Sequence, residues 1–565
     1  MTVTPVTHPI GTVGSVALSS EFAQADDDLL PPGLSVPQRE AVLADDRLLC
    51  VLAGAGAGKT RVLTLRVARR VHDSTAVADR VLVCTFSRKA ADEIGARLWT
   101  LDVAPIRSGT FHRLALALIR QHQRDRGTST VALAADRRRL LAEVLADAGA
   151  SGRRSNRELS VAALEGEIGW AKARLVSPEE YEREATANHR RAQAPAIASL
   201  YGTYEALKAC RSLLDLDDLL LRSADILEAD EPFAQAIRWR YRHLFVDEMQ
   251  DVNPAQFRLL RLLCSEHGDL FTVGDPHQAV YGWNGADPSL LADLPALMPG
   301  TRVLRLDDNH RSSPQIVRTA TAVLEASDVA PKSLRPDGPV PQVRAHDSQE
   351  AEADWVAGQV WLSHRPGRRW QHIAVLARTN AQLRLIGASL DQQRIPWRHA
   401  GHELSPASDL DREDSTTTEV GSQPERSPAA EARSDSQLDA VVLSTFHRAK
   451  GLQWPAVFVI GLSDSFVPIP SAWSPLARSE ERRLLYVALS RAEDELWCSW
   501  ARESGEVDRR EESGPSPWLA DIEATVRELE LENRPTEPEV AAHHVAKLRA
   551  LVQASVEPAL DRRAQ

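Results

Sequence analysis

The sequence predicts an α/β protein with two doubly wound parallel-sheet domains and an all-helical domain inserted in the first. Short apolar runs alternate with helical patterns, and most runs are continuous, as in parallel strands buried on both faces. Four runs precede residue 280 and five follow residue 300, which indicates two sheets, whereas residues 113–240 lack strand signals. The predicted strands are 48–52, 81–86, 243–248, 270–275, 303–306, 373–378, 441–446, 456–462 and 495–500.

Length and composition fit a soluble protein of several domains. At about 150 residues per domain, 565 residues correspond to roughly three or four domains. No apolar run reaches the length of a membrane span, and the five scattered cysteines fit a reducing cytoplasm. The net charge of −12 argues against a nucleic-acid partner unless the charge is unevenly distributed.

Composition sets the expected boundaries of the segments. The stretch 401–437 holds seven Ser and nine Asp and Glu with almost no large apolar residue, as in a linker or disordered loop. The expected segments are a disordered leader at 1–30, a first α/β domain at 31–112 and 216–300, its helical insertion at 113–215, a second α/β domain at 301–400 and 438–525, the acidic loop at 401–437, and a tail with one helix at 526–565.

The helical insertion is locally basic. Residues 113–215 carry 17 Arg and Lys against 13 Asp and Glu, inside a chain that is acidic overall. Charge alone favours a solvated helix face, because Leu140, Leu141, Val144 and Leu145 give an amphipathic pattern. A module that faces nucleic-acid phosphates is the alternative.

A phosphate-binding loop lies between the first strand and the helix that follows it. It reads Ala53-Gly54-Ala55-Gly56-Ala57-Gly58-Lys59-Thr60, with alanine at the first position of the G-x-x-x-x-G-K-[ST] pattern. The glycines let backbone N–H groups point at a phosphate. Lys59 is expected to reach the β- and γ-phosphates, and the Thr60 hydroxyl to hold Mg²⁺.

Two adjacent carboxylates end the strand at 243–248. Parallel sheets place ligands at the carboxyl ends of their strands, where Asp247 and Glu248 stand. Asp247 is expected to bind Mg²⁺, and Glu248 to orient or deprotonate the attacking water. The sequence therefore predicts hydrolysis of a nucleoside triphosphate.

With these motifs in place, Asp247-Glu248-Met249-Gln250-Asp251 resembles the UvrD/Rep/PcrA-like branch of superfamily 1 DNA helicases, whose core domains are RecA-like. Further motifs of that family follow in order over roughly residues 34–500. They are similar to Leu34–Gln38, Thr85–Ala91, Gly109–His112, Leu214–Leu220, Val273–Trp283, Asn309–Ser312, Thr445–Leu452 and Glu481–Ala492, and Trp170-Ala171-Lys172 in the insertion also resembles the family.

The resemblance implies roles for single residues at the nucleotide. Gln38 would read adenine, Arg61 and His310 would sandwich it, and Gln453 would bind a ribose hydroxyl. Gln278 would contact the γ-phosphate and link it to DNA. Transition-state charge on that phosphate calls for cations, and the family implies Arg311 and Arg491, both expected in the second α/β domain.

The resemblance also implies contacts with single-stranded DNA, which proteins hold by a basic track and stacking aromatics. Phe86, Thr110, Phe111, His112, Tyr281 and Trp283 occupy the corresponding positions. Core packing is the alternative for Phe86 and Phe111.

Four departures from the family stand out. Asn284 replaces an arginine, His310 a tyrosine and Gln453 a glutamate, and only 401–437 stands where relatives insert a second helical accessory domain. The leading hypothesis is an ATP- and Mg²⁺-dependent 3′–5′ DNA helicase or translocase of repair or recombination, acting on single-stranded and 3′-tailed duplex DNA. The alternatives are a translocase that displaces proteins with little unwinding, and a nucleotide-gated DNA-binding switch.

Overall fold

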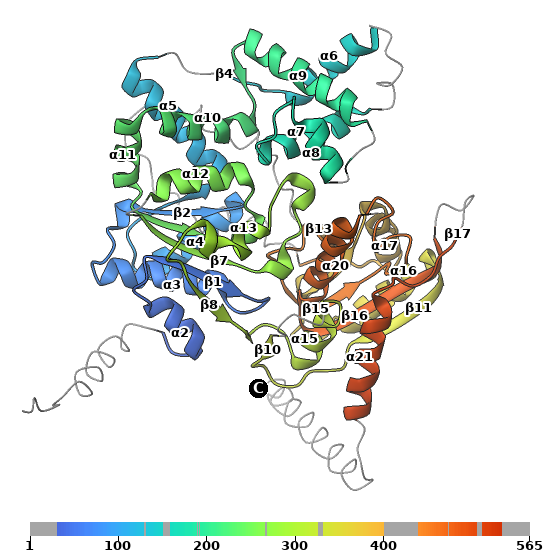
Figure 1. Ribbon diagram of the computed structural model, residues 1–565. Helices are drawn as coiled ribbons and strands as arrows, with labels where there is room; N and C mark the ends of the chain where they lie inside the picture. The colour runs from blue at the N-terminus through green and yellow to red at the C-terminus, as the bar shows by residue number, and fades with distance from the viewer. Residues whose placement is uncertain are drawn as a thin grey trace, which may run out of the picture. The chain divides into compact units, whose positions relative to one another are not determined.

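The computed structural model consists of two units (Figure 1). The second unit begins at Ser312. The structure describes residues 31–128, 132–150, 159–188, 190, 193–265, 268–325, 331–400, 439–472, 474–504 and 511–533. The predicted leader, the acidic segment 401–437 and the tail beyond residue 533 lie outside the described residues. No helix of the described part is long and apolar enough to cross a bilayer.

The first unit is built on a sheet of six parallel strands. The strands in spatial order are β3 (Arg107–Thr110), β2 (Val81–Thr85), β6 (His243–Val246), β7 (Asp269–Gly274), β1 (Leu48–Ala53) and β8 (Arg302–Leu306). Because β1 lies between β7 and β8, the phosphate-binding loop at the carboxyl end of β1 lies beside the carboxyl ends of these two strands.

Helices cover both faces of this sheet, because successive strand residues point to opposite sides. Cys50 and Cys84 face one helical layer, whereas Val51 and Val83 face the other. The first layer comprises α5 (Phe111–Arg126), α10 (Leu216–Ala229), α11 (Glu231–Arg240), α12 (Pro254–Cys264), α13 (Ser289–Ala292) and α14 (Leu294–Leu297). The second comprises α2 (Val36–Leu43), α3 (Lys59–His72) and α4 (Arg88–Thr100).

Two strands of this sheet differ from the sequence prediction. The run at 303–306 was grouped with the second domain, but β8 pairs with β1 and closes the first sheet. The sequence of a strand does not indicate which distant strand it pairs with, so the position of residues 303–306 along the chain predicted the wrong sheet. The strand β3 was missed because Arg-Ser-Gly-Thr contains no apolar run.

A separate helical core lies within the first unit. It is formed by α6 (Arg137–Ala150), α7 (Val161–Ala173), α8 (Tyr181–Ala187) and α9 (Ala194–Cys210), which gather together in Figure 1. The short strands β4 (Ala132–Leu133) and β5 (Leu213–Leu214) pair at its base. The helix α5, which was expected in this insertion, packs instead into the core of the α/β domain.

The second unit holds a second parallel sheet. Its strands in spatial order are β11 (Gln342–Ser348), β16 (Ala492–Ser504), β15 (Trp454–Val459), β12 (Ile373–Ala377), β14 (Val441–Thr445) and β13 (Trp397–His399), and β17 (Glu511–Glu512) adds an antiparallel edge. The sequence missed β11 and β13, which carry mostly polar residues.

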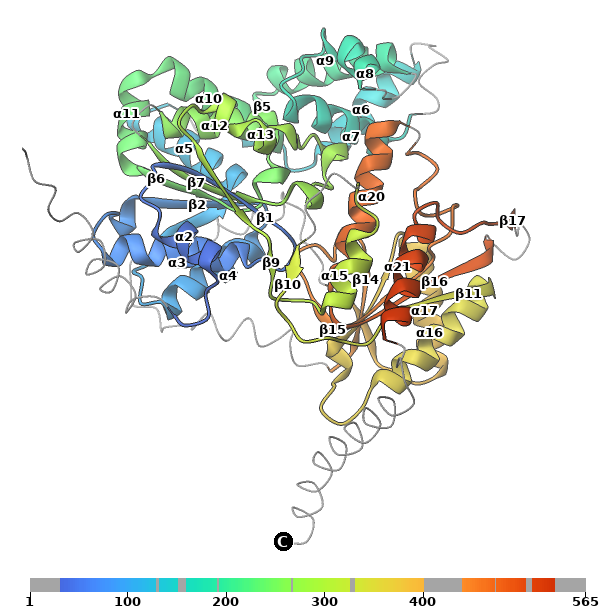
Figure 2. The same ribbon diagram turned by 60° about the horizontal axis from the view of Figure 1, so that its bottom comes forward.

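Helices also cover the second sheet, as Figure 2 shows. The buried residues of α16 (Gln349–Ser363) and α17 (Asn380–Gln392) join the strands in one core. The remaining helices are α15 (Pro314–Thr321), α20 (Pro475–Leu489) and α21 (Leu519–Glu532), and the last of these crosses the expected start of the tail at 526. The predicted fold class, two doubly wound α/β domains with a helical insertion in the first, is confirmed.

Candidate nucleotide and DNA site

The phosphate-binding loop joins β1 to the N-terminus of α3, where backbone N–H groups favour an anion. Lys59 is the first residue of α3, and its Nζ donates to the carbonyl oxygens of Ala53 at 3.2 Å and Gly54 at 3.4 Å. Its side chain therefore lies along the loop.

Two glycines of the loop allow neighbouring side chains to approach closely. Gly56 and Gly58 have φ of +73° and +81°, in the left-handed region. A Cβ on Gly56 would lie 2.7 Å from Asn309 Oδ1, and one on Gly58 would lie 2.9 Å from Gln38 Nε2. Asn309 Nδ2 and Gln38 Nε2 each donate at 2.8 Å to a loop carbonyl, those of Ala55 and Ala57.

The two predicted carboxylates stand directly after β6. Asp247 is buried, and its Oδ2 accepts from the Thr60 hydroxyl at 3.3 Å. Burial and the neighbouring Glu248 carboxylate raise the pKa of Asp247 to about 7. Glu248 itself has φ +54° and ψ +45°, an uncommon backbone conformation for a residue with a side chain. Such strain is a frequent feature of functional sites.

Asp275 links the lysine of the loop to Gln278. It lies at the end of β7, is 1% exposed, and has its Oδ2 3.8 Å from Lys59 Nζ and 2.6 Å from Gln278 Nε2. Gln250 supports the same corner, since its Oε1 accepts from the Asp275 N–H at 2.9 Å and its amide donates to Glu248. The sequence reasoning assigned no role to Asp275 or Gln250, although the predicted strand 270–275 already placed Asp275 at the ligand-binding edge.

The residues expected around adenine also lie beside the loop. Besides Gln38, His310 lies there, and its backbone N–H donates to the Gly56 carbonyl at 3.0 Å. The Arg61 guanidinium contacts the Gly33 carbonyl at 3.3 Å. The backbone N–H of Arg311 donates to Asn309 Oδ1 at 2.8 Å. Arg311 is the last residue of the first compact unit and directly precedes the second, and β8 carries the chain back to this edge of the first sheet.

Arg491 and Gln453 lie in the second unit. Arg491 follows α20 and is 1% exposed, with its Nε donating to the Val487 carbonyl at 2.9 Å and its Nη1 to the Leu452 carbonyl at 3.2 Å. Gln453 is exposed next to Leu452. The fold of this unit therefore brings these two residues of separate motifs together.

The aromatic residues expected at DNA separate into two groups. Trp283 is 56% exposed and Phe86 39% exposed, and the Phe86 ring stacks on Tyr281 with 4.9 Å between centroids. Phe111 is only 3% exposed and packs in the core of the first domain. For Phe111 the burial favours core packing, the alternative to a contact with bases, since α5 turns its ring towards the sheet.

Thr110 and His112 flank Phe111 at the start of α5. Thr110 caps the helix, and its Oγ1 accepts from the Arg113 N–H at 3.3 Å. Burial lowers the pKa of His112, while the nearby carboxylates of Asp217 and Asp215 act in the opposite direction. The lowered pKa favours the neutral imidazole of His112.

The helical insertion contacts the loop that carries Trp283. Arg174 Nη2, just after α7, lies 3.2 Å from Asp287 Oδ2. Gly285, with φ +92°, approaches α7 so closely that a Cβ would lie 2.5 Å from the Cβ of Ala173. The position of Trp283 thus depends on the insertion as well as on the sheet.

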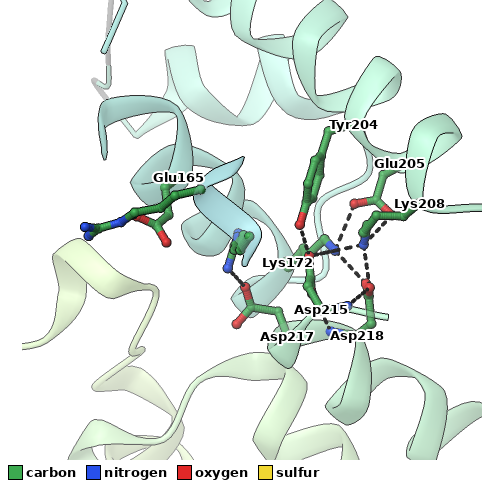
Figure 3. A network of polar contacts seen from close by, with 10 residues as sticks. Glu165, Lys172, Tyr204, Glu205, Lys208, Asp215, Asp217 and Asp218 are labelled. Atoms are coloured by element: carbon green, nitrogen blue, oxygen red, sulfur yellow. Dashed lines mark hydrogen bonds and ion pairs between the residues drawn. The ribbon is translucent and has the colours of Figure 1, made fainter. Parts of the chain in front are cut away.

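A buried charge network fixes the insertion to the start of α10, as Figure 3 shows. Lys172 Nζ lies 2.7 Å from Asp215, 2.5 Å from Asp218 and 2.8 Å from Glu205. Lys208 contacts the same three carboxylates, and the Tyr204 hydroxyl donates to Asp215 at 2.9 Å. The two ammonium groups occupy the space between the carboxylates, so the cluster requires no metal ion.

We expect Lys172→Met to lower the free energy of unfolding by about 3–5 kcal/mol, because it leaves buried carboxylates without one of their two cations. Urea unfolding followed by circular dichroism measures the change. Arg138→Met is the matched control, since it breaks an exposed pair with Glu165 in the same helical core. Equal stability of the two variants would contradict a stabilising role for the network.

Many basic residues of the insertion form ion pairs. Besides the two lysines, many arginines there form ion pairs, namely Arg126, Arg137, Arg138, Arg174, Arg183, Arg190 and Arg211. These pairs favour the interpretation that the basic residues belong to the folded surface of the helices, over the alternative that they face nucleic-acid phosphates.

The fold and the site define a P-loop nucleoside triphosphatase with two α/β units. Family models match most of the chain: the UvrD/REP helicase N-terminal domain over residues 34–298, and the UvrD-like helicase C-terminal domain over residues 304–403 and 425–503. The chain therefore belongs to the UvrD-like helicase family and is an ATP-dependent DNA helicase of the UvrD/PcrA type.

The chain is also similar to curated proteins that are named as ATP-dependent DNA helicases. The chain is 34% identical to the ATP-dependent DNA helicase UvrD2 of Mycobacterium tuberculosis, over 88% of this chain and 83% of that protein. It is 29% identical to the ATP-dependent DNA helicase PcrA of Staphylococcus epidermidis, over 66% of this chain and 51% of that protein. The PcrA of Staphylococcus aureus is also 29% identical, over 65% and 51%.

Proposed function

We propose that this helicase moves 3′–5′ along single-stranded DNA and acts on 3′-tailed duplexes in DNA repair or recombination. The direction and the role in repair or recombination follow from the family. The observation that supports coupling between nucleotide and DNA is the link from Lys59 through Asp275 to Gln278, three residues before Tyr281. A γ-phosphate would compete with the Asp275 carboxylate for the Lys59 ammonium and shift Gln278, and with it the loop that presents Tyr281 and Trp283. Nucleotide state would thereby change the grip on a base.

Mg²⁺ fits the donor set beside the loop. The Thr60 hydroxyl and the Asp247 carboxylate lie next to each other, and hard oxygen donors are those that Mg²⁺ prefers. A cation there would offset the repulsion between Asp247 and Glu248, which contributes to the raised pKa of Asp247. When bound with ATP, the ion supplies charge that stabilises the phosphoryl-transfer transition state.

The remaining roles follow from chemistry and position. Glu248 orients and deprotonates the attacking water, while Arg311 from the first unit and Arg491 from the second supply positive charge to the γ-phosphate during turnover. Gln38, Arg61 and His310 bind the adenine, and Gln453 binds the ribose. All five cysteines are free thiols, which suits a reducing cytoplasm.

A strand-displacement assay beside an ATPase assay tests the proposal. We expect single-stranded DNA to stimulate ATP hydrolysis, and a 3′-tailed duplex to be opened in preference to 5′-tailed and blunt duplexes. Preference for the 5′ tail would overturn the polarity. DNA-dependent binding without hydrolysis would favour the nucleotide-gated switch.

The sequence itself favours translocation with weak unwinding. Only 401–437 stands where relatives insert a second accessory domain, and opening a duplex requires about 1.4 kcal/mol per base-pair step. We therefore expect movement along single strands, with displacement of bound protein, but poor opening of long duplexes by the isolated protein.

Deleting most of 401–437 should leave DNA-stimulated ATPase nearly unchanged, because the segment cannot bury a core and carries no proposed site residue. Steady-state ATPase and streptavidin displacement from 3′-biotinylated and 5′-biotinylated oligonucleotides measure the two activities. Processive opening of long duplexes that the deletion abolishes would show that the acidic segment takes part in unwinding.

A further inference from the structure

Gln250 lies where the chain leaves β6 and passes the end of β7. It belongs to the short 3₁₀-helical turn η3 (Met249–Asp251), which begins directly after the left-handed backbone of Glu248. The Gln250 side chain is fully buried, with an exposed fraction of 0%. Burial of an amide costs free energy unless its polar atoms are hydrogen-bonded, so its partners show what it holds in place.

Both ends of the Gln250 amide have partners. Its Nε2 donates to Glu248 Oε2, and its Oε1 accepts from the backbone N–H of Asp275 at 2.9 Å. These partners fix the orientation of the amide, because an ionised carboxylate only accepts and a backbone N–H only donates. A side chain that joins these two groups needs a donor and an acceptor together, which an amide provides and a carboxylate or an ammonium group does not.

The end of β7 leaves room for this amide. The residue before Asp275 is Gly274, and a Cβ there would lie 2.7 Å from Gln250 Oε1 and 2.8 Å from Leu291 Cδ2. Even an alanine would therefore displace the amide or its neighbour. The glycine lets β7 and η3 approach closely enough for the hydrogen bond between Gln250 and Asp275.

The other hydrogen bond of the amide acts on the residue to which we assign activation of water. A general base has to lie within hydrogen-bond reach of the proton that it removes. The side chain of a glutamate has several rotatable bonds, and the bond from Gln250 to Glu248 Oε2 restricts the direction of its carboxylate. A misplacement of about 1 Å at a reacting group can lower the rate by about 10²-fold.

We propose that Gln250 is a positioning residue, which orients Glu248 towards the attacking water and links that orientation to the corner around Asp275. The inference rests on the proposed role of Glu248 as the base. The Asp275 carboxylate lies 3.8 Å from Lys59 Nζ and accepts from the Gln278 amide. A change at the phosphate or in the loop after Gln278 therefore reaches the base through a single side chain.

Gln250→Leu removes both hydrogen bonds and keeps a side chain of similar size. We expect kcat for DNA-stimulated ATP hydrolysis to fall by about 10²-fold, because the carboxylate of Glu248 loses its fixed direction. The KM for ATP should change by less than about threefold, since the amide acts on the water and not on nucleotide binding. Steady-state kinetics of the full chain with saturating single-stranded DNA, beside binding of a fluorescent ATP analogue, measure the split.

A double variant separates positioning from a general loosening of the fold. Glu248→Gln/Gln250→Leu should hydrolyse ATP no more slowly than Glu248→Gln alone, because a residue that acts only through the base has no effect once the base is removed. Single-turnover assays resolve the low rates of both proteins.

Gly274→Ala tests the link from the other side. Its Cβ should displace the Gln250 amide and lower kcat, with no further loss when it is combined with Gln250→Leu. Gly358→Ala is the matched control, since a Cβ there meets nothing within 4 Å. Should Gln250→Leu fail to fold, Gly274→Ala against Gly358→Ala carries the test.

Gln315→Leu is the matched control for Gln250→Leu. Gln315 lies in the second unit and is 6% exposed. Its amide also joins a carboxylate to a backbone N–H, since it donates to Asp337 at 3.1 Å and accepts from Gly338 at 2.8 Å. The substitution removes the same two kinds of hydrogen bond, yet it should leave kcat within about twofold. Thermal unfolding compares the stability of the two variants.

Normal kcat in a folded Gln250→Leu protein would overturn the inference. So would a further loss of turnover in Glu248→Gln/Gln250→Leu, or an equal loss in Gln315→Leu, because either result describes damage to the fold. Near-normal turnover in Glu248→Gln would overturn the proposed base and this inference with it. Low turnover in Glu248→Gln beside normal turnover in Gln250→Leu would overturn this inference alone.

Discussion

Glu248→Gln should leave ATP binding intact and lower DNA-stimulated turnover by about 10²- to 10⁴-fold, the range that general-base catalysis contributes. The carboxylate acts on the attacking water and not on the affinity for nucleotide. Gln has nearly the same shape and keeps a carbonyl oxygen as an acceptor for the Gln250 amide, so the corner around Asp275 should stay in place. Binding of a fluorescent ATP analogue and steady-state hydrolysis measure the two effects separately.

Glu228→Gln is the matched control for this prediction. Glu228 is exposed on α10 and pairs with Arg258, so the same chemical change there should alter neither binding nor turnover. Near-normal turnover in Glu248→Gln would contradict the assignment of Glu248 as the base. Loss of nucleotide binding would show that the Glu248 carboxylate is needed to maintain the nucleotide site.

Much of the candidate site could be predicted because its residues stand next to each other in the sequence. The loop from Ala53 to Thr60 follows one buried strand, and Asp247 and Glu248 follow another. The residues next to each motif therefore predict the strand that positions it. The meeting of Thr60 with Asp247 then follows from the rule that ligands bind at the carboxyl ends of parallel strands.

The features that could not be predicted from the sequence depend on contacts between distant segments. The strand β8 pairs with β1 and not with the second sheet, and no local pattern in Arg302–Leu306 indicates the partner strand. The same holds for Asp275, whose distance from Lys59 depends on the order of β7 and β1 in the sheet.

The direction in which a single side chain of a helix points was also beyond local reasoning. Phe111 occupies a family motif for DNA, yet the direction of α5 turns its ring into the core, whereas Phe86 remains accessible. Lys172 belongs to a basic segment, but burial among three carboxylates makes it a structural residue. In both cases the packing of a whole helix decides the role of the residue.

Arg491→Ala should lower kcat for DNA-stimulated ATP hydrolysis by about 10³-fold, within the range for arginine fingers, because a cation at the γ-phosphate stabilises charge that develops in the transition state. The substitution should change nucleotide affinity far less than turnover. Binding and steady-state kinetics on the full chain, with saturating single-stranded DNA, measure the split between the two.

The buried hydrogen bonds of Arg491 make a stability control necessary. Its guanidinium donates to the carbonyls of Val487 and Leu452, so Arg491→Ala also removes two hydrogen bonds within the second unit. Arg491→Lys keeps the charge but not the planar fork of donors, and it should recover part of the lost turnover if charge is what the reaction needs. Thermal unfolding of both variants separates misfolding from lost chemistry. A well-folded Arg491→Ala protein with normal kcat would show that the guanidinium only holds the start of β16 against the chain at Leu452.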